Sequence, residues 1–165
     1  MTNNRRHYAF ARHALVTAFG VVGARSGSRV LVPDFIDKPG ALERLMAARP
    51  DVFNHNTETV PRLYKKARPG GRYERVKDIF RFAKSVAPDI PTKTGIIVGL
   101  GETNEEVLAT MRDLRTVDVD ILTIGQYLRP TPKHAPMTRY YHPDEFRELK
   151  RIAMGMGQTR VSLDA

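Results

Sequence analysis

One stretch constrains the fold of this chain more than any other: PTKTGIIVGLGE, residues Pro91–Glu102. Its centre, Gly95–Gly99, is a short apolar run with β-branched residues, which is typical of a strand buried on both faces. Small and polar residues follow, and Thr103 with Glu106 three positions later forms the capping-box pattern of a helix start. The chain is therefore predicted to leave a buried strand through a glycine turn and to enter a helix. In parallel α/β folds, ligands bind at such junctions.

Apolar runs and amphipathic stretches alternate along the rest of the chain. Strands are predicted at about 29–32, 51–56, 95–99 and 120–125, and helices at about 41–48, 57–64, 73–87, 104–116 and 143–155. Such alternation implies parallel strands joined by right-handed crossovers. Four strands cannot close a barrel, so the predicted fold class is α/β, a partial (β/α) TIM-like barrel of about four parallel strands with outer helices. Its edge strands are expected to be exposed.

The chain is predicted to divide into three parts: residues 1–28 as an unassigned basic leader, 29–157 as the partial barrel, and 158–165 as a divergent tail. Residues 1–33 contain five arginines and no acid. The leader is interpreted as a loosely packed segment, and its composition, which resembles that of an organellar transit peptide, gives the alternative interpretation. The expected location is cytoplasmic, or mitochondrial if the leader is a transit peptide.

Charge and composition exclude several classes of function. The net charge is +9, but the body of the chain does not interleave aromatic and basic residues, so no nucleic-acid partner is predicted. No apolar run approaches the roughly 20 residues that span a bilayer, so no membrane association is predicted. The sequence has no cysteine, which excludes disulfides and thiolate chemistry within this chain.

Polar residues and glycines follow the predicted strands at the points where they end. They are Asn54, Asn56, Glu58, Gly99, Gly101, Glu102 and Gln126. Because the carboxyl ends of parallel strands share one edge of the sheet, these residues are expected to meet there. Glycines allow a ligand to approach the backbone, carboxylates accept hydrogen bonds from hydroxyls, and amides both donate and accept. The set therefore predicts a site for a ligand with a ribose, a base and a charged tail.

Each of these candidates has a plainer interpretation. Glu58 is also placed to be an acid in the first turn of a helix, where the helix dipole favours it. Glu102 is placed to cap the helix after Thr103, and Arg129 to be a surface charge before Pro130. His55 has no partner at metal-ligand spacing and is interpreted as a structural histidine. No nucleophile–base pair stands out, so no catalytic residue and no metal ligand is assigned.

Several motifs resemble known proteins. The pattern Gly95-x-Ile97-x-Gly99-x-x-Glu102 is similar to the G-x-I-x-G-x-x-E pattern of radical S-adenosylmethionine enzymes. The segments VLVPDF, ARPDVFNHNTETVPRLYKKARPG, PTKTGIIVGLGET, DILTIGQYLRPT and YYHPDEF resemble the lipoyl synthase family. This resemblance runs from about Arg29 to about Met156. NHNTETV and TIGQYLRPT together are specific, whereas the glycine pattern alone is a weak signal.

The resemblance implies an activity and a set of cofactors. Lipoyl synthases cleave S-adenosylmethionine at one 4Fe–4S cluster, and the resulting radical abstracts hydrogens from an octanoyl chain on a carrier-protein lysine. A second 4Fe–4S cluster donates sulfur. By resemblance, Asn54, Asn56 and Glu58 lie on the ribose side of S-adenosylmethionine and residues 99–102 beside its adenine. Gln126 matches the end of the sixth strand of the family barrel.

The chain departs from this family in two respects. The cysteine triplets of the family lie upstream of the matching segment, and this chain has no cysteine to hold a cluster. The segment QTRVSLDA departs from the carboxyl-terminal segment of the family. We therefore expect a chain that is inactive alone, as a fragment or as half of a split enzyme whose companion chain carries the cysteine motifs. The alternative is a non-catalytic adenosyl-binding or protein-interaction module.

Overall fold

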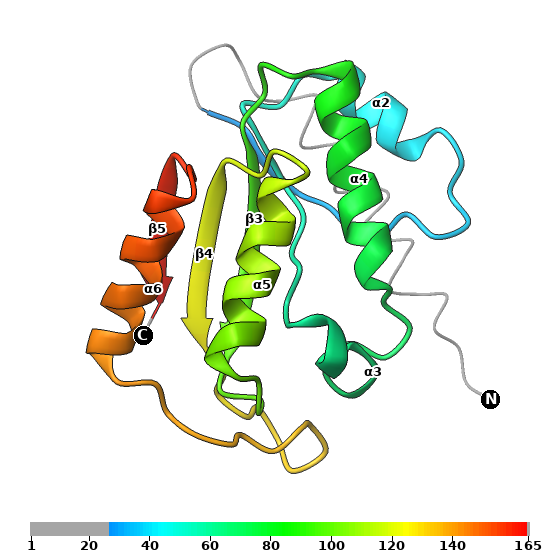
Figure 1. The fold of residues 1–165 in the computed structure, drawn as a ribbon. Helices are drawn as coiled ribbons and strands as arrows, with labels where there is room; N and C mark the ends of the chain where they lie inside the picture. The colour runs from blue at the N-terminus through cyan, green and yellow to red at the C-terminus, as the bar shows by residue number, and fades with distance from the viewer. Residues whose placement is uncertain (1–26, 165) are drawn as a thin grey trace, which may run out of the picture.

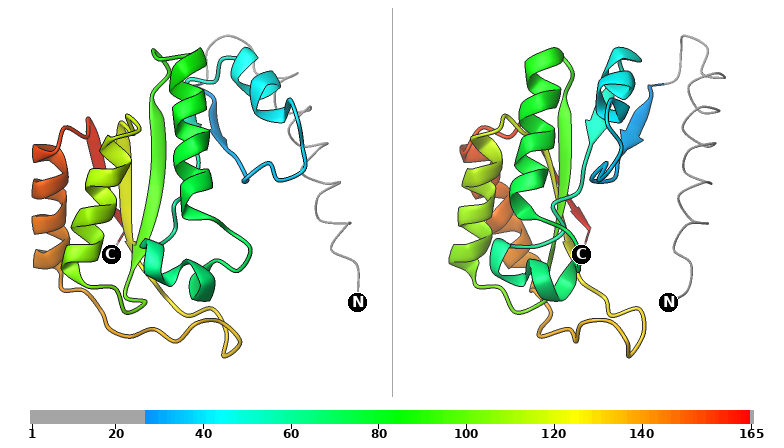
Figure 2. Two further views of the ribbon diagram at one scale, coloured as in Figure 1. Left: turned by 45° about the vertical axis from the view of Figure 1, so that its right-hand side comes forward. Right: turned by 90° about the vertical axis from the view of Figure 1, so that its right-hand side faces the viewer.

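The computed structural model describes residues 27–164. They form one sheet of five parallel strands in the order β1-β2-β3-β4-β5, with helices packed on one face (Figures 1 and 2). The strands are β1 (Arg29–Leu31), β2 (Val52–Asn54), β3 (Thr92–Val98), β4 (Ile121–Gln126) and β5 (Arg160–Asp164). The helices are α2 (Ala41–Ala47), the 3-10 turn η1 (Pro61–Leu63), α3 (Tyr64–Ala67), α4 (Tyr73–Val86), α5 (Asn104–Arg115) and α6 (Pro143–Gly155).

The predicted fold class is confirmed, with one strand more than expected. The sheet is parallel, its helices lie on the outside, and in the described part β1 and β5 are its two edges. The additional strand β5 falls within residues 158–165, which the sequence analysis assigned to a tail. It pairs with β4 from Ile121↔Arg160 to Gly125↔Asp164, and the backbone of Thr159 donates to the carbonyl of Asp120 just before it.

The central strand β3 has two different faces. Its alternate residues Thr92, Thr94, Ile96 and Val98 are buried, whereas those between them are half-buried. The buried set faces the helices, where Ile96 and Val98 join an apolar core shared by α4, α5 and α6. The other side of the sheet, here called the open face, has no described helix packed on it (Figure 2).

Local signals explain how the helices begin. Thr103 accepts a hydrogen bond from the backbone of Glu106, whose carboxylate accepts from the backbone of Thr103, so the predicted capping box is present. Helix α6 begins at Pro143, as expected for a residue that lacks a backbone donor. Its cap, His142, accepts from the backbone of Asp144. No helix in the described part is long and apolar enough to cross a membrane.

The helix predicted from residue 57 does not begin there. Glu58 instead forms a parallel bridge with Ile96, and the helical path starts three residues later at Pro61. The backbone of Glu58 has φ of 70°, a left-handed conformation that few non-glycine residues adopt. Pairing with β3 therefore overrides the local helix signal and extends the contact of this segment with the central strand.

We predict that the core of the sheet dominates stability. Leu122 is completely buried on the helix side of β4, whereas Leu128 in the loop after β4 is 65% exposed. Leu122→Ala should lower the free energy of unfolding by about 2–5 kcal/mol, because it leaves a cavity in a packed interior. The control Leu128→Ala should change it by less than about 0.5 kcal/mol. Urea unfolding followed by circular dichroism measures both, and equal losses would contradict this assignment of the core.

Candidate functional site

Asparagine side chains lie on the open face around Gly95. Asn54 of β2 is in register with Lys93 of β3, and Gly95 is in register with Thr123 of β4. A Cβ added to Gly95 would lie 3.2 Å from Oδ1 of Asn56, so the Asn56 side chain rests on this backbone. The missing side chain at position 95 therefore lets Asn56 approach the middle of the sheet.

Two buried polar atoms of this cluster have no hydrogen-bond partner in the described part of the chain: Oδ1 of Asn54 and Oγ1 of Thr123. The side-chain amide of Asn56 also has no hydrogen bond to the described residues. Buried polar atoms in proteins are nearly always satisfied. Amides and a hydroxyl that both donate and accept suit a ligand rich in hydroxyl groups and ring nitrogens.

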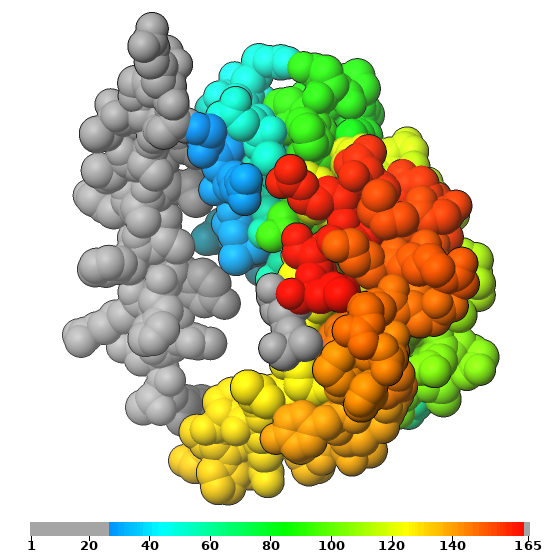
Figure 3. Space-filling view, turned by 90° about the vertical axis from the view of Figure 1, so that its left-hand side faces the viewer, coloured from blue at the N-terminus to red at the C-terminus, as the bar shows by residue number. Residues whose placement is uncertain are grey.

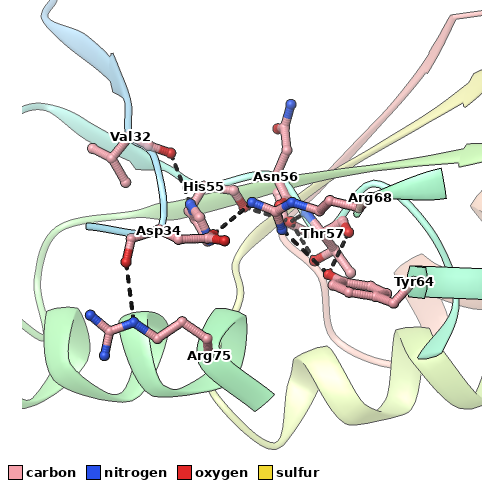
Figure 4. A network of polar contacts seen from close by, with 9 residues as sticks. Val32, Asp34, His55, Asn56, Thr57, Tyr64, Arg68 and Arg75 are labelled. Atoms are coloured by element: carbon pink, nitrogen blue, oxygen red, sulfur yellow. Dashed lines mark hydrogen bonds and ion pairs between the residues drawn. The ribbon is translucent and has the colours of Figure 1, made fainter. Parts of the chain in front are cut away.

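The segment that carries these asparagines is fixed from its other side by His55 (Figure 4). The His55 ring is completely buried, and its Nδ1 lies 2.8 Å from the carbonyl oxygen of Val32. Nε2 of the same ring lies 3.1 Å from Oδ1 of Asp34. Both ring nitrogens thus face oxygen atoms of the loop after β1. His55 therefore has a structural role, as predicted.

Asp34 connects this histidine to two arginines. Nη2 of Arg68 lies 2.6 Å from Oδ1 of Asp34, and Nη1 of Arg68 donates to the carbonyl of Asn56 over 3.1 Å. Nε of Arg75 donates to the backbone carbonyl of Asp34. The hydrogen bond from His55, opposed by burial and assisted by Arg68, holds the pKa of Asp34 below its ordinary value of 3.8. The backbone at Asn56 is therefore anchored to the loop after β1.

Thr57 and Thr94 form the second anchor of this segment. The backbone of Thr57 donates to Oγ1 of Thr94 over 3.0 Å, and the two hydroxyls lie 2.8 Å apart. The hydroxyl of Tyr64 donates to the carbonyl of Thr57 over 2.6 Å, and burial raises the pKa of Tyr64 to about 12. The sequence analysis missed these positioning residues, together with Asp34 and Arg68. A threonine at a helix-facing position of β3 was the available signal for Thr94.

Glu102 has internal partners and does not cap α5. Its Oε1 accepts from the backbone of Gly99 over 2.6 Å, and its Oε2 accepts from the backbone of Leu100 over 2.9 Å. The residue is 8% exposed. Burial and the neighbouring Glu102 carboxylate raise the pKa of the Tyr141 hydroxyl. Glu102 thus closes the turn after β3. The sequence analysis considered Glu102 as a cap of the following helix, but Glu106 is the residue that caps it.

Gln126 holds a long loop, residues 127–142, against the same turn. Its Oε1 accepts from the backbone of Tyr141 over 2.9 Å, and its Nε2 donates to the carbonyls of Val98, Tyr127 and Arg139. The backbone of Thr138 donates to the carbonyl of Gly99 over 2.7 Å. The end of β4 and the turn after β3 are therefore joined through this loop.

The two predicted glycines are required by this packing. Gly99 and Gly101 have φ of 103° and 107°, a region that side chains strongly disfavour. A Cβ on Gly99 would lie 2.4 Å from Nε2 of Gln126 and 2.7 Å from the carbonyl oxygen of Arg139. A Cβ on Gly101 would lie 3.2 Å from Oγ1 of Thr138. The two glycines therefore let the turn after β3 pack closely against Gln126 and the loop of residues 127–142.

The predicted site residues thus fall into two groups. Asn54 and Asn56 lie on the open face, where Oδ1 of Asn54 is buried without a partner and the Asn56 side chain has no hydrogen bond to the described residues. The others at the turn, Gly99, Gly101, Glu102 and Gln126, form one hydrogen-bonded unit at the carboxyl end of β3 and β4. Glu58 belongs to neither group by side-chain contact, but its backbone bonds to Gly95 and Ile97 join it to β3 beside both. Direct contact of all seven with one ligand stays a prediction.

Within the described residues, no group of three or more histidine or acidic side chains is arranged to hold a metal ion. Arg129, for which the sequence analysis gave a surface charge as the plainer interpretation, is exposed and donates to the carbonyls of Pro132 and His134. It lies in the loop after β4 and is a surface residue.

Comparison with known proteins decides the family. The sequence profile of the radical SAM superfamily matches residues 12–114, more than half of the chain. The chain belongs to the radical SAM superfamily. Among solved structures, SuiB of Streptococcus suis superposes with a TM-score of 0.70 at 11% identity, over 93% of this chain and 35% of that chain. Methylornithine synthase, PylB, superposes with a TM-score of 0.66 at 17% identity, over 94% of this chain and 53% of that chain.

Within the superfamily, the sequence is similar to curated lipoyl synthases, as predicted. The lipoyl synthase of Koribacter versatilis is 58% identical over 132 residues, which are 80% of this chain and 43% of that protein. The lipoyl synthase of Alcanivorax borkumensis is 54% identical over 136 residues, 81% of this chain and 41% of that protein. The chain is therefore similar to one part of these lipoyl synthases and spans about two fifths of their length.

We predict that the Asp34–His55 contact makes stability depend on pH. A carboxyl whose pKa is lowered by folding stabilises the protein above its unfolded pKa, and this contribution is lost as pH falls through the folded value. Asp34→Asn should cost about 3 kcal/mol near neutral pH, because it removes the carboxylate that pairs with Arg68 and faces the buried His55 ring. The difference from the unchanged protein should shrink as the pH falls below about 4. The exposed control Asp37→Asn should show neither effect. Thermal unfolding at several pH values measures both, and a pH-independent difference would contradict the prediction.

We also predict that Gly99 tolerates no side chain. Gly99→Ala forces alanine into a left-handed conformation and into contact with Gln126, and should cost at least about 1–3 kcal/mol. The matched control is Gly155→Ala at the end of α6, where a Cβ meets nothing within 4 Å; it should change stability by no more than about 1 kcal/mol. Chemical denaturation provides the measurement. Similar stability of the two variants would show that the turn rearranges freely.

Proposed function

We propose that this chain is the nucleoside-binding part of a lipoyl synthase-like protein. The activity of the whole protein would be radical-SAM sulfur insertion into protein-bound octanoyl groups, in lipoate biosynthesis. Identities of 52–58% to curated lipoyl synthases support the proposal. So does the position of Asn54 and Asn56, which lie within the segment that carries the specific resemblance. The expected location is the cytoplasm.

The observation that carries this proposal is the pair of free asparagines on the open face. Their amides suit the hydroxyls of a ribose, and the backbone of residues 99–101 offers a surface beside which a flat base would lie. In this arrangement Glu58, Glu102 and Gln126 would complete the S-adenosylmethionine site, Glu102 and Gln126 by shaping the turn. S-adenosylmethionine supplies, when reductively cleaved, a radical that removes hydrogen from an unactivated carbon. The residues of this chain would bind and orient it.

The residues present do not fit an iron–sulfur cluster. Such clusters are held by cysteine thiolates, and this sequence contains none. We therefore derive no step through a cluster. We propose instead that the cysteine ligands come from a companion chain and that this chain alone does not insert sulfur. The protein partner would be an octanoylated lipoyl-carrier domain.

The absence of cysteine also favours a second candidate function, a module that binds an adenosyl ligand or another protein without redox chemistry. The two functions differ in what the chain does with iron. Anaerobic reconstitution with iron and sulfide should leave the chain without a 4Fe–4S absorbance band. A band at stoichiometric iron would overturn the companion-chain proposal.

We predict that the full chain binds S-adenosylmethionine through the open face. Titration calorimetry with S-adenosylmethionine and with S-adenosylhomocysteine should give saturable heat. Asn54→Ala combined with Asn56→Ala should weaken binding about tenfold, the equivalent of one to two lost hydrogen bonds. The control Ser85→Ala, exposed near the end of α4, should bind normally. No heat and no thermal shift up to millimolar ligand would reject the nucleoside site.

A further inference from the structure

The loop after β4 presents unpaired positive charge at the carboxyl edge of the sheet. Residues 127–142 contain Arg129, Lys133 and Arg139 and no acid. Arg139 pairs with Glu145. Arg129 donates only to backbone carbonyls, and Lys133 is exposed without an ion pair to any residue between 27 and 164. Two charges of this loop are therefore not neutralised by the described protein.

Helix α3 adds charge at the same end of the molecule (Figure 1). Lys65 and Lys66 are exposed there and form no ion pair with the described residues. Two nearby acids are already paired: Glu106 with Arg62, and Asp144 with Arg147. Glu105 remains as an exposed acid at the start of α5. The balance of unpaired charge around this edge is positive.

Large apolar side chains accompany these cations. Leu128 is 65% exposed and Tyr140 is 66% exposed. The loop that carries them extends beyond the ends of the strands (Figure 1) and forms the yellow and orange part of the surface in Figure 3. Tyrosine and arginine side chains are enriched at protein–protein interfaces, and an exposed aliphatic side chain adds apolar surface that a partner can cover. We call this surface the rim patch: Lys65, Lys66, Leu128, Arg129, Lys133 and Tyr140.

The loop is held in one shape before any partner binds. The hydroxyl of Tyr127 donates to the carbonyl of Ala135 over 2.8 Å, and Nε of Arg129 donates to the carbonyl of His134 over 3.0 Å. The Thr131 hydroxyl lies 2.9 Å from Nδ1 of His134. Gln126 fixes both ends of the loop. A surface that is already ordered loses little conformational entropy on binding, which favours specific recognition.

We propose that the rim patch is the docking surface for an acidic face of the protein domain that carries the substrate. This inference rests on the proposed function, in which the octanoyl chain is attached to a lysine of a carrier domain. If the octanoyl group reaches the open face past the carboxyl edge of the sheet, the carrier domain to which it is attached lies against the residues around that edge. Those residues are cationic and apolar, so the carrier surface around its lysine should be acidic with an apolar contact. The rim patch has few cations, and Leu128 and Tyr140 lie between them. Such a surface suits a folded protein partner better than the continuous phosphate backbone of a nucleic acid.

The test measures binding of the full chain to a lipoyl-carrier domain octanoylated on its lysine and labelled for fluorescence anisotropy. Two versions of the carrier are used, one with acidic residues flanking the lysine and one with those residues replaced by their amides. The unchanged chain should bind the acidic version at least about tenfold more tightly, and added salt should weaken that binding. Arg129→Glu combined with Lys133→Glu should abolish the preference.

The matched control reverses two exposed cations elsewhere, Arg112→Glu in α5 combined with Lys150→Glu in α6, with the same change in net charge. This control should keep the preference for the acidic carrier. Equal binding by the rim variant and the unchanged chain would overturn the proposal. So would equal loss in the control, or displacement of the carrier by a short DNA duplex or by anionic vesicles at lower concentration than by unlabelled carrier.

Calorimetry with S-adenosylmethionine on the same variants separates this inference from the function on which it rests. The rim variant should keep the affinity of the unchanged chain, because none of its substitutions touches Asn54 or Asn56. If carrier binding follows the rim charges while S-adenosylmethionine does not bind, the docking surface stands and the nucleoside site fails. If S-adenosylmethionine binds and the carrier ignores the rim charges, the docking surface alone fails.

Discussion

The buried carboxylate of Glu102 determines the shape of the carboxyl edge of the sheet. It accepts hydrogen bonds from the backbones of Gly99 and Leu100, two donors that the strand leaves unpaired where it ends. Backbone donors of this kind would be costly to bury without an acceptor. The turn that results brings the carbonyl of Gly99 to the loop after β4, and Gln126 completes the contact. One carboxylate therefore sets both the start of α5 and the position of a loop that lies 25 to 40 residues further along the chain.

The segment from Asn54 to Glu58 depends on a different set of contacts, centred on Asp34. This carboxylate joins the buried ring of His55 to Arg68, which in turn holds the carbonyl of Asn56. All of these groups lie below the sheet on its helix side, and the Asn56 side chain points the opposite way (Figure 4). The network thus positions the asparagines from behind and leaves their amides free.

Much of the fold could be predicted because its signals are local. The capping box of Thr103 and the start of α6 at Pro143 depend only on neighbouring residues. Strand β5 was missed because Arg160–Asp164 has only two apolar residues and becomes a strand by pairing with β4. The segment at Glu58 was wrongly predicted as helix because its pairing with Ile96 is a long-range contact. Sequence also marked Glu102 and Gln126 as ligand contacts, since a polar residue at a strand end looks the same whether it faces a ligand or the chain itself.

The two supporting networks bear on how the described part relates to the rest of a barrel. The contacts that position Asn54 and Asn56 come from β1, β2, β3 and the helices α3 and α4, all within residues 27–164. The positions of the two asparagines are therefore set by contacts within the described part of the chain. By contrast, strands β1 and β5 have a neighbour on one side only in the described sheet, and exposed parallel edges invite further pairing. The described residues thus fix the asparagines of the proposed site by their own contacts, whereas the two edge strands of the sheet are suited to pair with further strands.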